Sequence, residues 1–414
     1  MSLLGSQEDA PAQSRWQNWA GTQECSPSGR VRAQSVEEVR DAVSKAAERG
    51  TSLRVVGAGH SFGPLVCTDG IILDVSAISG VRHVDAATYR ARVGAGTLIA
   101  SLGDPLWERG CSLINQGDID TQTIAGALST ATHGSGLEFG SLSSSLTRAE
   151  LVTPTGELLV VEEDDPLLDA VRTSIGCLGV LTEVELQLMP AYQLVEHVEH
   201  WPLAEVFERW AEETRTRRHF SFFWGPYKAS LELYDLPPAP AHVEEACYVK
   251  RYDAVAADAA GVTSPTGRVD RAYRIYADDY PPGWDELEYF VPYDVALEAI
   301  EAVRPVLARF PAQRFPVEVR TIAAESGLLS PAYGRPSVAL SFSGAVGTDY
   351  EGFLRGIDAA LREFGARAHW GKTHFHDAER LREVYPRYED FVAIRRSMDP
   401  DGIFLNELTR AMMA

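Results

Sequence analysis

Cysteine is scarce in this chain, which has only five among its 414 residues. The five are far apart and include no Cys-x-x-Cys pair, so the sequence excludes a zinc ribbon and a disulfide scaffold. Few, scattered cysteines are typical of proteins from a reducing compartment. We therefore expect a cytoplasmic protein without a metal site.

Basic residues are also in the minority, with 38 Lys and Arg against 59 Asp and Glu and a net charge of -21. Nucleic acids and anionic membrane surfaces attract clustered basic side chains, so neither is an expected partner. No apolar run approaches the roughly 18 residues that a membrane-spanning helix needs. Residues 1–14 are polar, resemble no signal peptide and are expected to form a flexible tail.

Two segments resemble nucleotide-binding motifs but do not match them. Gly57-x-Gly59 has Phe62 in place of the third glycine of a dinucleotide-binding fingerprint. Gly365 and Gly371-Lys372-Thr373 are separated by one residue too many for a phosphate-binding P-loop. The sequence thus favours neither of these folds.

What the chain does contain is an ordinary globular composition, with 45% hydrophobic residues, and enough length for two domains. Hydrophobic periodicity predicts helices at residues 35–50, 97–109, 204–216, 294–309 and 350–364. It predicts strands at residues 53–56, 71–75, 90–93, 317–321 and 337–342, a hairpin over 149–161, and irregular structure at 236–241 and 254–268. Because these elements follow no regular βαβ period, we predict an α+β fold with a domain boundary near residue 190.

Two loops are rich in glycine and small residues, at 57–62 and 125–136. Each could be an ordinary tight turn. Alternatively, closely spaced glycines let backbone N–H groups converge on an anionic ligand, and His60 would stand at the tip of the first loop.

Two charged segments could carry chemistry. Glu318 and Arg320 share one face of a predicted strand, where they form either a weak surface pair or, in a cleft, a polar clamp for hydroxyl groups. The segment His369-Trp370-Gly371-Lys372 is either a solvated turn or a basic corner of the same site.

Together these segments resemble the sugar-lactone and alditol oxidase branch of the FAD-linked oxidases, the vanillyl-alcohol-oxidase type of flavoprotein. The resemblance rests on 57–62, on Ile124-Ala125-Gly126 to Thr132-His133-Gly134-Ser135-Gly136, on Ser174-x-Gly176-x-x-Gly179-Val180, on Glu318-x-Arg320 and on 369–372. It runs from Trp16 to the end of the chain, including the segment 399–406.

The resemblance implies an FAD-binding domain at 15–190, a substrate domain with an antiparallel sheet and covering helices at 191–369, and a segment at 370–414 that returns to the first domain. It also implies an FAD bonded covalently to the ring of His60. The positions that match FAD-contacting residues are Val56, Gly57, Ala58, Gly59, His60, Ser61, Phe62, Asp118, Thr123, Gly126, Thr130, Ala131, Thr132, His133, Leu181 and His369.

By the same resemblance, Glu318, Arg320 and Lys372 hold and activate a substrate hydroxyl while a hydride moves to flavin N5. Lys372 beside Arg320 would lose its proton readily and accept the hydroxyl proton, or both cations would stabilise a developing alkoxide. We expect these cations to stand out against the acidic chain.

The expected activity is oxidation of a sugar-derived lactone of the L-gulono- or D-arabinono-1,4-lactone kind, with O2 as acceptor and H2O2 as product, by a monomer. The alternatives are an alditol or other carbohydrate-like alcohol, or a dehydrogenase with a non-oxygen acceptor. Gly117, where dehydrogenases of the family carry a larger residue, favours an oxidase.

Two departures from the family's pattern matter. Asp118 stands where the family often has Ser. Ser341 replaces a His, and Ser343 matches a Thr. The loss of the His weakens the alditol alternative.

Overall fold

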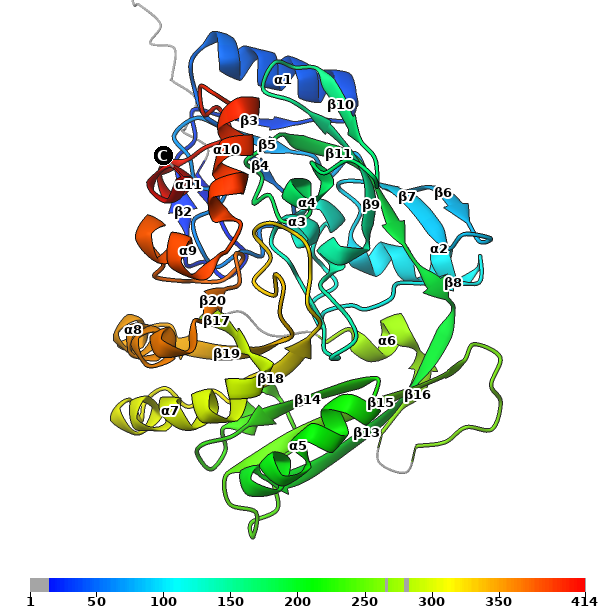
Figure 1. Ribbon diagram of the computed structural model, residues 1–414, viewed down its shortest axis with the longest axis vertical. Helices are drawn as coiled ribbons and strands as arrows, with labels where there is room; N and C mark the ends of the chain where they lie inside the picture. The colour runs from blue at the N-terminus through cyan, green and yellow to red at the C-terminus, as the bar shows by residue number, and fades with distance from the viewer. Residues whose placement is uncertain (1–14, 265–266, 279–282, 414) are drawn as a thin grey trace, which may run out of the picture.

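A computed structural model describes residues 15–264, 267–278 and 283–413, so the predicted flexible tail at 1–14 lies outside the described residues. The chain forms two halves, stacked one above the other in Figure 1. Antiparallel sheets and helices mix in both, which confirms the predicted α+β class. The exact domain boundaries near 190 and 369 stay a prediction.

The first half contains a small parallel sheet and a five-stranded antiparallel sheet, of orders β3-β5-β4 and β10-β9-β11-β7-β6. The strands of these sheets are β3 (Gly29–Arg32), β4 (Leu53–Val56), β5 (Ile71–Asp74), β6 (Val81–Asp85), β7 (Arg90–Gly94), β9 (Leu146–Val152), β10 (Leu158–Val161) and β11 (Val180–Gln187). Two short ladders add β1 (Trp16–Gln17) with β2 (Glu24–Cys25) and β8 (Cys111–Ser112) with β12 (Met189–Pro190). The helices are α1 (Val36–Glu48), α2 (Gly103–Trp107), α3 (Ile124–Ser129) and α4 (Leu168–Val171).

Most local predictions for this half are confirmed. Ser35 caps α1 by accepting a hydrogen bond from the Glu38 backbone N–H, and β9 and β10 form the predicted hairpin. The predicted helix at 97–109 is wrong as one element. It is a 3-10 turn at Ile99–Leu102 followed by α2, because Pro105 fits only the first turn of a helix and so starts a new one.

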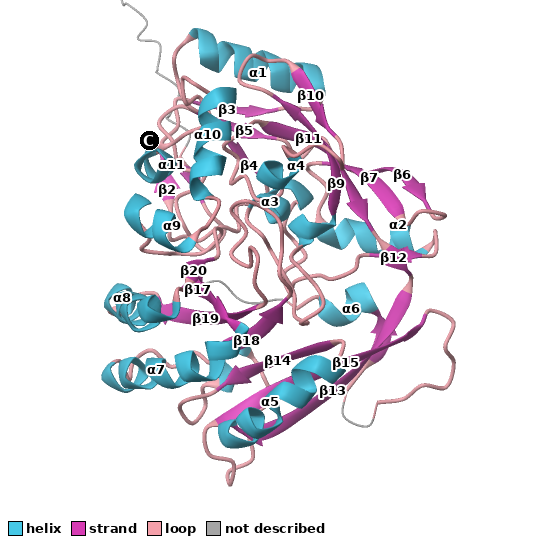
Figure 2. Ribbon diagram, in the orientation of Figure 1, coloured by secondary structure: helices cyan, strands magenta, loops and turns pink. Residues whose placement is uncertain are grey.

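The second half is built on one eight-stranded antiparallel sheet of order β16-β13-β15-β14-β18-β19-β17-β20 (Figure 2). Its strands are β13 (Tyr192–Pro202), β14 (His219–Trp224), β15 (Ala246–Ala256), β16 (Val269–Arg271), β17 (Trp284–Pro292), β18 (Val317–Ile322), β19 (Ser337–Ala345) and β20 (Arg367–Ala368). The helices are α5 (Leu203–Thr216), α6 (Ala272–Tyr276), α7 (Ala296–Arg309) and α8 (Tyr350–Leu361). The prediction of irregular structure from 254 is wrong for 254–256, which continue β15 in register with β13.

Strict alternation gives this sheet two different faces. Val319 on β18, Leu287 on β17 and Leu340 on β19 point to one side, where they pack with α5, α7 and α8 in a buried apolar cluster. Their neighbours in sequence, such as Glu318 and Glu288, therefore point to the other side, toward the first half. One face of the sheet is thus a core and the other carries polar chemistry.

The C-terminal segment lies against the first half. Its helices are α9 (Ala378–Val384), α10 (Tyr388–Met398) and α11 (Glu407–Met413), drawn in red beside the blue N-terminal elements in Figure 1. Phe391 joins the main apolar cluster of the first half, and Phe404 packs into the cluster under α1. The backbone N–H of Leu53 donates to the carbonyl of Ile403 over 2.8 Å, so the end of the chain helps to hold β4 and the loop after it.

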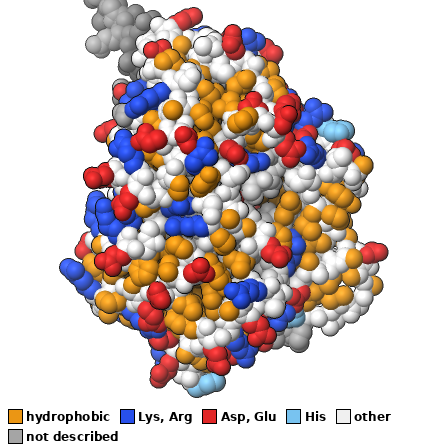
Figure 3. Space-filling model, viewed as in Figure 1, with side chains coloured by type: hydrophobic (Ala, Val, Ile, Leu, Met, Phe, Trp, Pro, Cys, Tyr) orange, Lys and Arg blue, Asp and Glu red, His pale blue; other side chains and the backbone are white. Residues whose placement is uncertain are grey.

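No helix among the described residues is long and apolar enough to cross a membrane. On the face shown in Figure 3, acidic and basic side chains are interspersed and do not form one large patch of a single sign.

Candidate functional site

Two cavities meet where the halves of the molecule face each other. They share the lining residues His60, Ser61, Gln122 and Thr130. One cavity is lined mainly by glycine loops and small side chains of the first half, and we call it the cradle. The other is lined largely by charged and aromatic side chains, many of them from the eight-stranded sheet, and we call it the clamp.

The cradle depends on residues that have no side chain. A Cβ on Gly57 would fall 2.0 Å from Thr123 Oγ1, so the two segments can approach only because residue 57 is glycine. Gly59 has a φ of +72°, a left-handed conformation that glycine adopts without strain. Thr123 in turn caps α3 by accepting from the Gly126 N–H. These contacts keep the cavity wall close to the backbone.

A buried arginine, Arg54, is hydrogen-bonded to the backbone of the loops that surround the cradle. Arg54 on β4 is only 3% exposed and donates to the carbonyl oxygens of Leu65 over 2.7 Å and Ile175 over 2.9 Å. It also donates to Phe404 in the C-terminal segment. Three segments that are remote in sequence are therefore held around one guanidinium group.

These residues fit the flavin cofactor that the resemblance implies. The wall combines glycine backbone, small residues and hydroxyls, which suit phosphate groups, with apolar side chains such as Leu65, Ile175 and Leu181, which suit a flat ring. Where the two cavities meet, Gln122 Oε1 and, nearby, Thr132 Oγ1 are buried and have no hydrogen-bond partner among the described residues. Unpaired buried polar atoms are costly, so these two are best explained by a polar ligand that pairs with them.

His60 stands at the junction of the two cavities. Its ring stacks on Trp19 with centroids 4.9 Å apart, and its Nε2 lies 2.9 Å from Thr121 Oγ1. Burial and the nearby charge of Lys372 lower the pKa of His60 to about 4. The imidazole is therefore neutral near pH 7 and keeps a nitrogen lone pair.

The clamp begins on β18. Glu318 Oε1 lies 3.4 Å from Arg320 Nε, and both side chains face the cavity, as the spacing of two residues on a strand requires. Burial, reinforced by Asp118 and Glu288 and only partly opposed by Arg320, raises the pKa of Glu318 to about 8. This carboxyl group therefore changes its protonation close to physiological pH.

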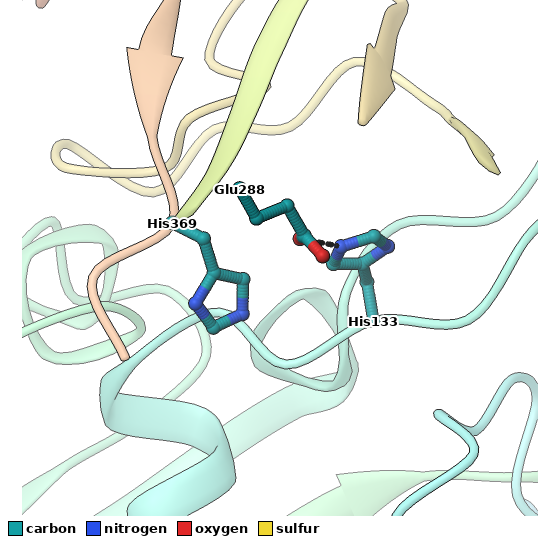
Figure 4. Close-up of side chains that lie close together, drawn as sticks. All are labelled: His133, Glu288 and His369. Atoms are coloured by element: carbon teal, nitrogen blue, oxygen red, sulfur yellow. Dashed lines mark hydrogen bonds and ion pairs between the residues drawn. The ribbon is translucent and has the colours of Figure 1, made fainter. Parts of the chain in front are cut away.

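A fully buried carboxylate, Glu288 on β17, lies behind Arg320. Its Oε2 accepts from Arg320 Nη2 over 2.7 Å, and its Oε1 lies 2.7 Å from His133 Nε2 (Figure 4). The hydroxyl of Ser341 on β19 donates to the same carboxylate. Burial alone would raise the pKa of Glu288, but Arg320 and His133 outweigh it and hold that pKa well below its ordinary value.

Glu288, His133 and His369 have the composition of a metal site, with donor atoms within 4.8 Å of one another. The guanidinium of Arg320, however, already pairs with this carboxylate, and a bound cation would be repelled by it. Burial lowers the pKa of His369 to about 3, and its Nδ1 accepts from the Gly371 N–H over 3.0 Å. The cluster is better described as a charge-paired network.

Lys372 pairs with a carboxylate on β17, that of Glu286, and its Nζ lies 4.8 Å from the ring centre of Phe62. Lys372 and Arg320 line the same cavity, and the effect of Arg320 on the lysine stays a prediction. The expectation that the clamp concentrates cations is wrong, since four carboxylates (Asp118, Glu286, Glu288 and Glu318) line it beside Arg320 and Lys372. The cations are paired because an unpaired charge is costly to bury.

Most of the predicted site residues line these two cavities. The clamp has Phe62, Asp118, Thr132, His133, Glu318, Arg320, His369 and Lys372; the cradle has Gly57, Ala58, Gly59, Thr123, Gly126 and Leu181; and both have His60, Ser61 and Thr130. Val56 and Ala131 line neither cavity. Ala131 is buried with a φ of +60°, and it shapes the loop that carries Thr130 and Thr132.

Sequence reasoning missed the residues of the clamp that come from β17 and the aromatic wall. Glu286 and Glu288 alternate with Leu287 and Tyr289 along β17, a pattern that could have predicted a polar face, and Trp284 lies on that same face. The wall also includes Trp19, Phe223 and Tyr234, and the Tyr234 hydroxyl is hydrogen-bonded to Ser343.

Comparisons with known proteins agree with this geometry. Residues 27–162 match the family model of the FAD binding domain, and residues 243–412 match that of D-arabinono-1,4-lactone oxidase. The chain is 36% identical to L-gulono-1,4-lactone dehydrogenase of Mycobacterium tuberculosis over 96% of this chain and 99% of that protein. It is 30% identical to the alditol oxidase of a Streptomyces species (96% and 98% covered), and 26% identical to the L-gulonolactone oxidase of Bos taurus (95% and 96% covered).

Among solved structures, cholesterol oxidase from B. sterolicum superposes with a TM-score of 0.78 at 16% identity over 100% of both chains, which shows a shared fold. The sequence relatives cover nearly the full length of this chain at up to 36% identity. The chain therefore belongs to the vanillyl-alcohol-oxidase-type family of FAD-linked oxidoreductases that act on CH–OH groups and that includes the lactone and alditol oxidases.

Proposed function

We propose that this protein oxidises a hydroxyl-bearing carbon of a sugar-derived lactone of the L-gulono- or D-arabinono-1,4-lactone kind. FAD, when bound, supplies a hydride acceptor. The observation that carries the proposal is the junction of the two cavities at His60, where a cofactor cradle opens onto a clamp of Glu318, Arg320 and Lys372. The names of the relatives support the substrate class.

Within the clamp, Arg320 and Glu318 hold the substrate hydroxyl, and Glu318 accepts its proton. A carboxyl group with a pKa of about 8 is matched to this role, because an effective general base has a pKa close to the working pH. Lys372, paired with the carboxylate of Glu286, stabilises the negative charge that develops on the substrate oxygen.

The cofactor is proposed to be bonded covalently to the His60 ring, whose neutral nitrogen and place at the junction support the link. Acid precipitation of the purified protein tests this point. Yellow colour should stay in the pellet, whereas colour left wholly in the supernatant would refute the bond.

O2 is proposed as the electron acceptor, with H2O2 as product. Gly117 lines the clamp without a side chain, so the wall there leaves room for O2. A Cβ at this position would lie 3.0 Å from the carbonyl oxygen of His133, so a side chain there would require that carbonyl to shift slightly. We also propose that the protein is a cytoplasmic monomer whose domain boundaries lie near residues 190 and 369. Its five free cysteines support a reducing compartment.

An alditol substrate is less well supported. Ser341 and Ser343 stand where the alditol oxidases carry a His and a Thr. Their hydroxyls are hydrogen-bonded to the side chains of Glu288 and Tyr234. A panel of lactones and polyols, assayed for peroxide and in parallel with an artificial electron acceptor, tests substrate and acceptor together. Turnover of polyols but of no lactone would reject the proposed substrate, and turnover only with the artificial acceptor would reject O2.

A further inference from the structure

The fully buried carboxylate of Glu288 contacts three separate parts of the molecule. It receives hydrogen bonds from Arg320 on β18, from Ser341 on β19 and from His133 in the loop after α3. Its backbone carbonyl also accepts from the His369 N–H over 2.9 Å. The strand β17 thereby links the sheet to the loop that borders the cradle.

Arg320 is fixed on three sides by these partners. Its Nη2 lies 2.7 Å from Glu288 Oε2, its Nη1 donates to the His133 carbonyl over 3.3 Å, and its Nε faces Glu318 at 3.4 Å. Ala339 stands opposite Arg320 on β19, and this small residue leaves the guanidinium room to reach across to β17. The strongest of the three contacts is the charged pair with Glu288, because the carboxylate is fully desolvated.

We propose that Glu288 is a positioning residue: it orients the guanidinium of Arg320 toward the substrate hydroxyl and keeps it aligned with the flavin-side loop through His133. Glu288 borders the clamp cavity, but its side chain has 0% exposure and pairs with Arg320, so we assign it a role through the guanidinium and no direct contact with the substrate. The inference rests on the proposed function, since it assigns to Arg320 the task of holding the substrate. It adds a residue that acts only through that guanidinium.

A double-mutant cycle tests whether Glu288 acts through Arg320. Glu288→Gln should lower kcat about 10²-fold, because a misplacement of about 1 Å in a positioning group costs that much, with a smaller change in the Kd of the lactone from titration of flavin absorbance. Arg320→Ala should lower kcat at least as much. The double variant should match Arg320→Ala within about threefold, since the two side chains form one unit.

Multiplied effects in the double variant would overturn the proposal, because they would mean that Glu288 acts independently of Arg320. If wild-type protein oxidises none of the lactones, the proposed function fails instead, and the two failures are thus distinguishable. Should Glu288→Gln not fold, the same cycle is run with Glu288→Asp, which keeps the charge but moves it back by one methylene.

Chemical rescue gives a readout that a purely structural role would not change. Methylguanidinium, added at low concentration to Arg320→Ala, should restore part of kcat by occupying the space between Glu288 and Glu318. The rescue should disappear in Arg320→Ala combined with Glu288→Gln; equal rescue in both would contradict the proposal. Leu287→Ala, on the opposite face of β17, is the control: it should lower the melting temperature and leave kcat unchanged.

Discussion

The cradle and the clamp differ in the means by which they would hold a ligand. The cradle is made from backbone, glycine and small side chains of the first half, and its shape depends on close approaches such as that of Gly57 to Thr123. The clamp is made from charged side chains on one face of a sheet, and its shape depends on paired charges. A steric change should therefore damage the cradle, and a change of charge or pH should damage the clamp.

The largest expected effect is in the clamp. Lys372→Ala should leave FAD bound but lower kcat/KM by about 10²–10³-fold, the usual cost of removing one group that stabilises developing charge. Steady-state kinetics with the preferred lactone measures kcat/KM, and visible absorbance measures the amount of bound flavin. Lys228→Ala, at an exposed position, is the control; near-normal kinetics of Lys372→Ala would remove this lysine from the account.

The cradle should respond in the opposite way. Gly57→Ala places a methyl group 2.0 Å from Thr123 Oγ1, and overpacking of this kind costs about 1–3 kcal/mol, so the fraction of the protein that incorporates FAD should fall. Turnover per bound flavin should change little. Gly29→Ala is a matched control, since its nearest neighbour would be 3.9 Å away. Equal flavin content in the two variants would contradict the steric description of the cradle.

A smaller effect concerns the pH dependence of kcat/KM, which at pH 7 should be about tenfold below its value at high pH. Since the pKa of Glu318 is raised to about 8, its base form is a minority at pH 7 and increases with pH. The wild-type kcat/KM should rise about tenfold per pH unit below pH 8 and level off above it. Glu318→Gln should have a low kcat/KM that does not rise with pH in this range. If kcat/KM of the variant rises in the same way, the titrating group is not Glu318.

The smallest effect should come from Ser341→Ala. This change removes one of three donors to Glu288 but leaves its contacts with Arg320 and His133. We expect kcat within about threefold of wild type. A loss near that of Glu288→Gln would mean that Ser341 contributes to the clamp in its own right.

The sequence predicted the cradle better than the clamp for a physical reason. A glycine loop such as 57–62 is a local signal, because the residues that shape the backbone are adjacent in the chain. The partners of Glu288 are 32 residues away at Arg320 and 155 residues away at His133. The register of β17, β19 and β18 brings Arg320 to Glu288, and the packing of the loop after α3 against the sheet brings His133; both are properties of the folded protein.

Helices and strands were predicted well where one face is strongly apolar, as in α1 and α5. The predicted helix at 97–109 contains Pro105, which limits helix formation on its N-terminal side, so two shorter elements form there. The predicted roles of Glu318, Arg320 and Lys372 came from the resemblance. Their common cavity could not be derived from spacing, since Lys372 reaches it from a loop beyond the sheet.

The most direct test of the account is anaerobic mixing of the FAD-loaded protein with L-gulono-1,4-lactone or D-arabinono-1,4-lactone, followed by the flavin's visible absorbance. The account predicts rapid bleaching in the wild type and bleaching slowed at least about 10²-fold in Lys372→Ala at equal flavin content. Absorbance that stays unchanged with every lactone tested, or that bleaches equally fast in both proteins, would contradict it.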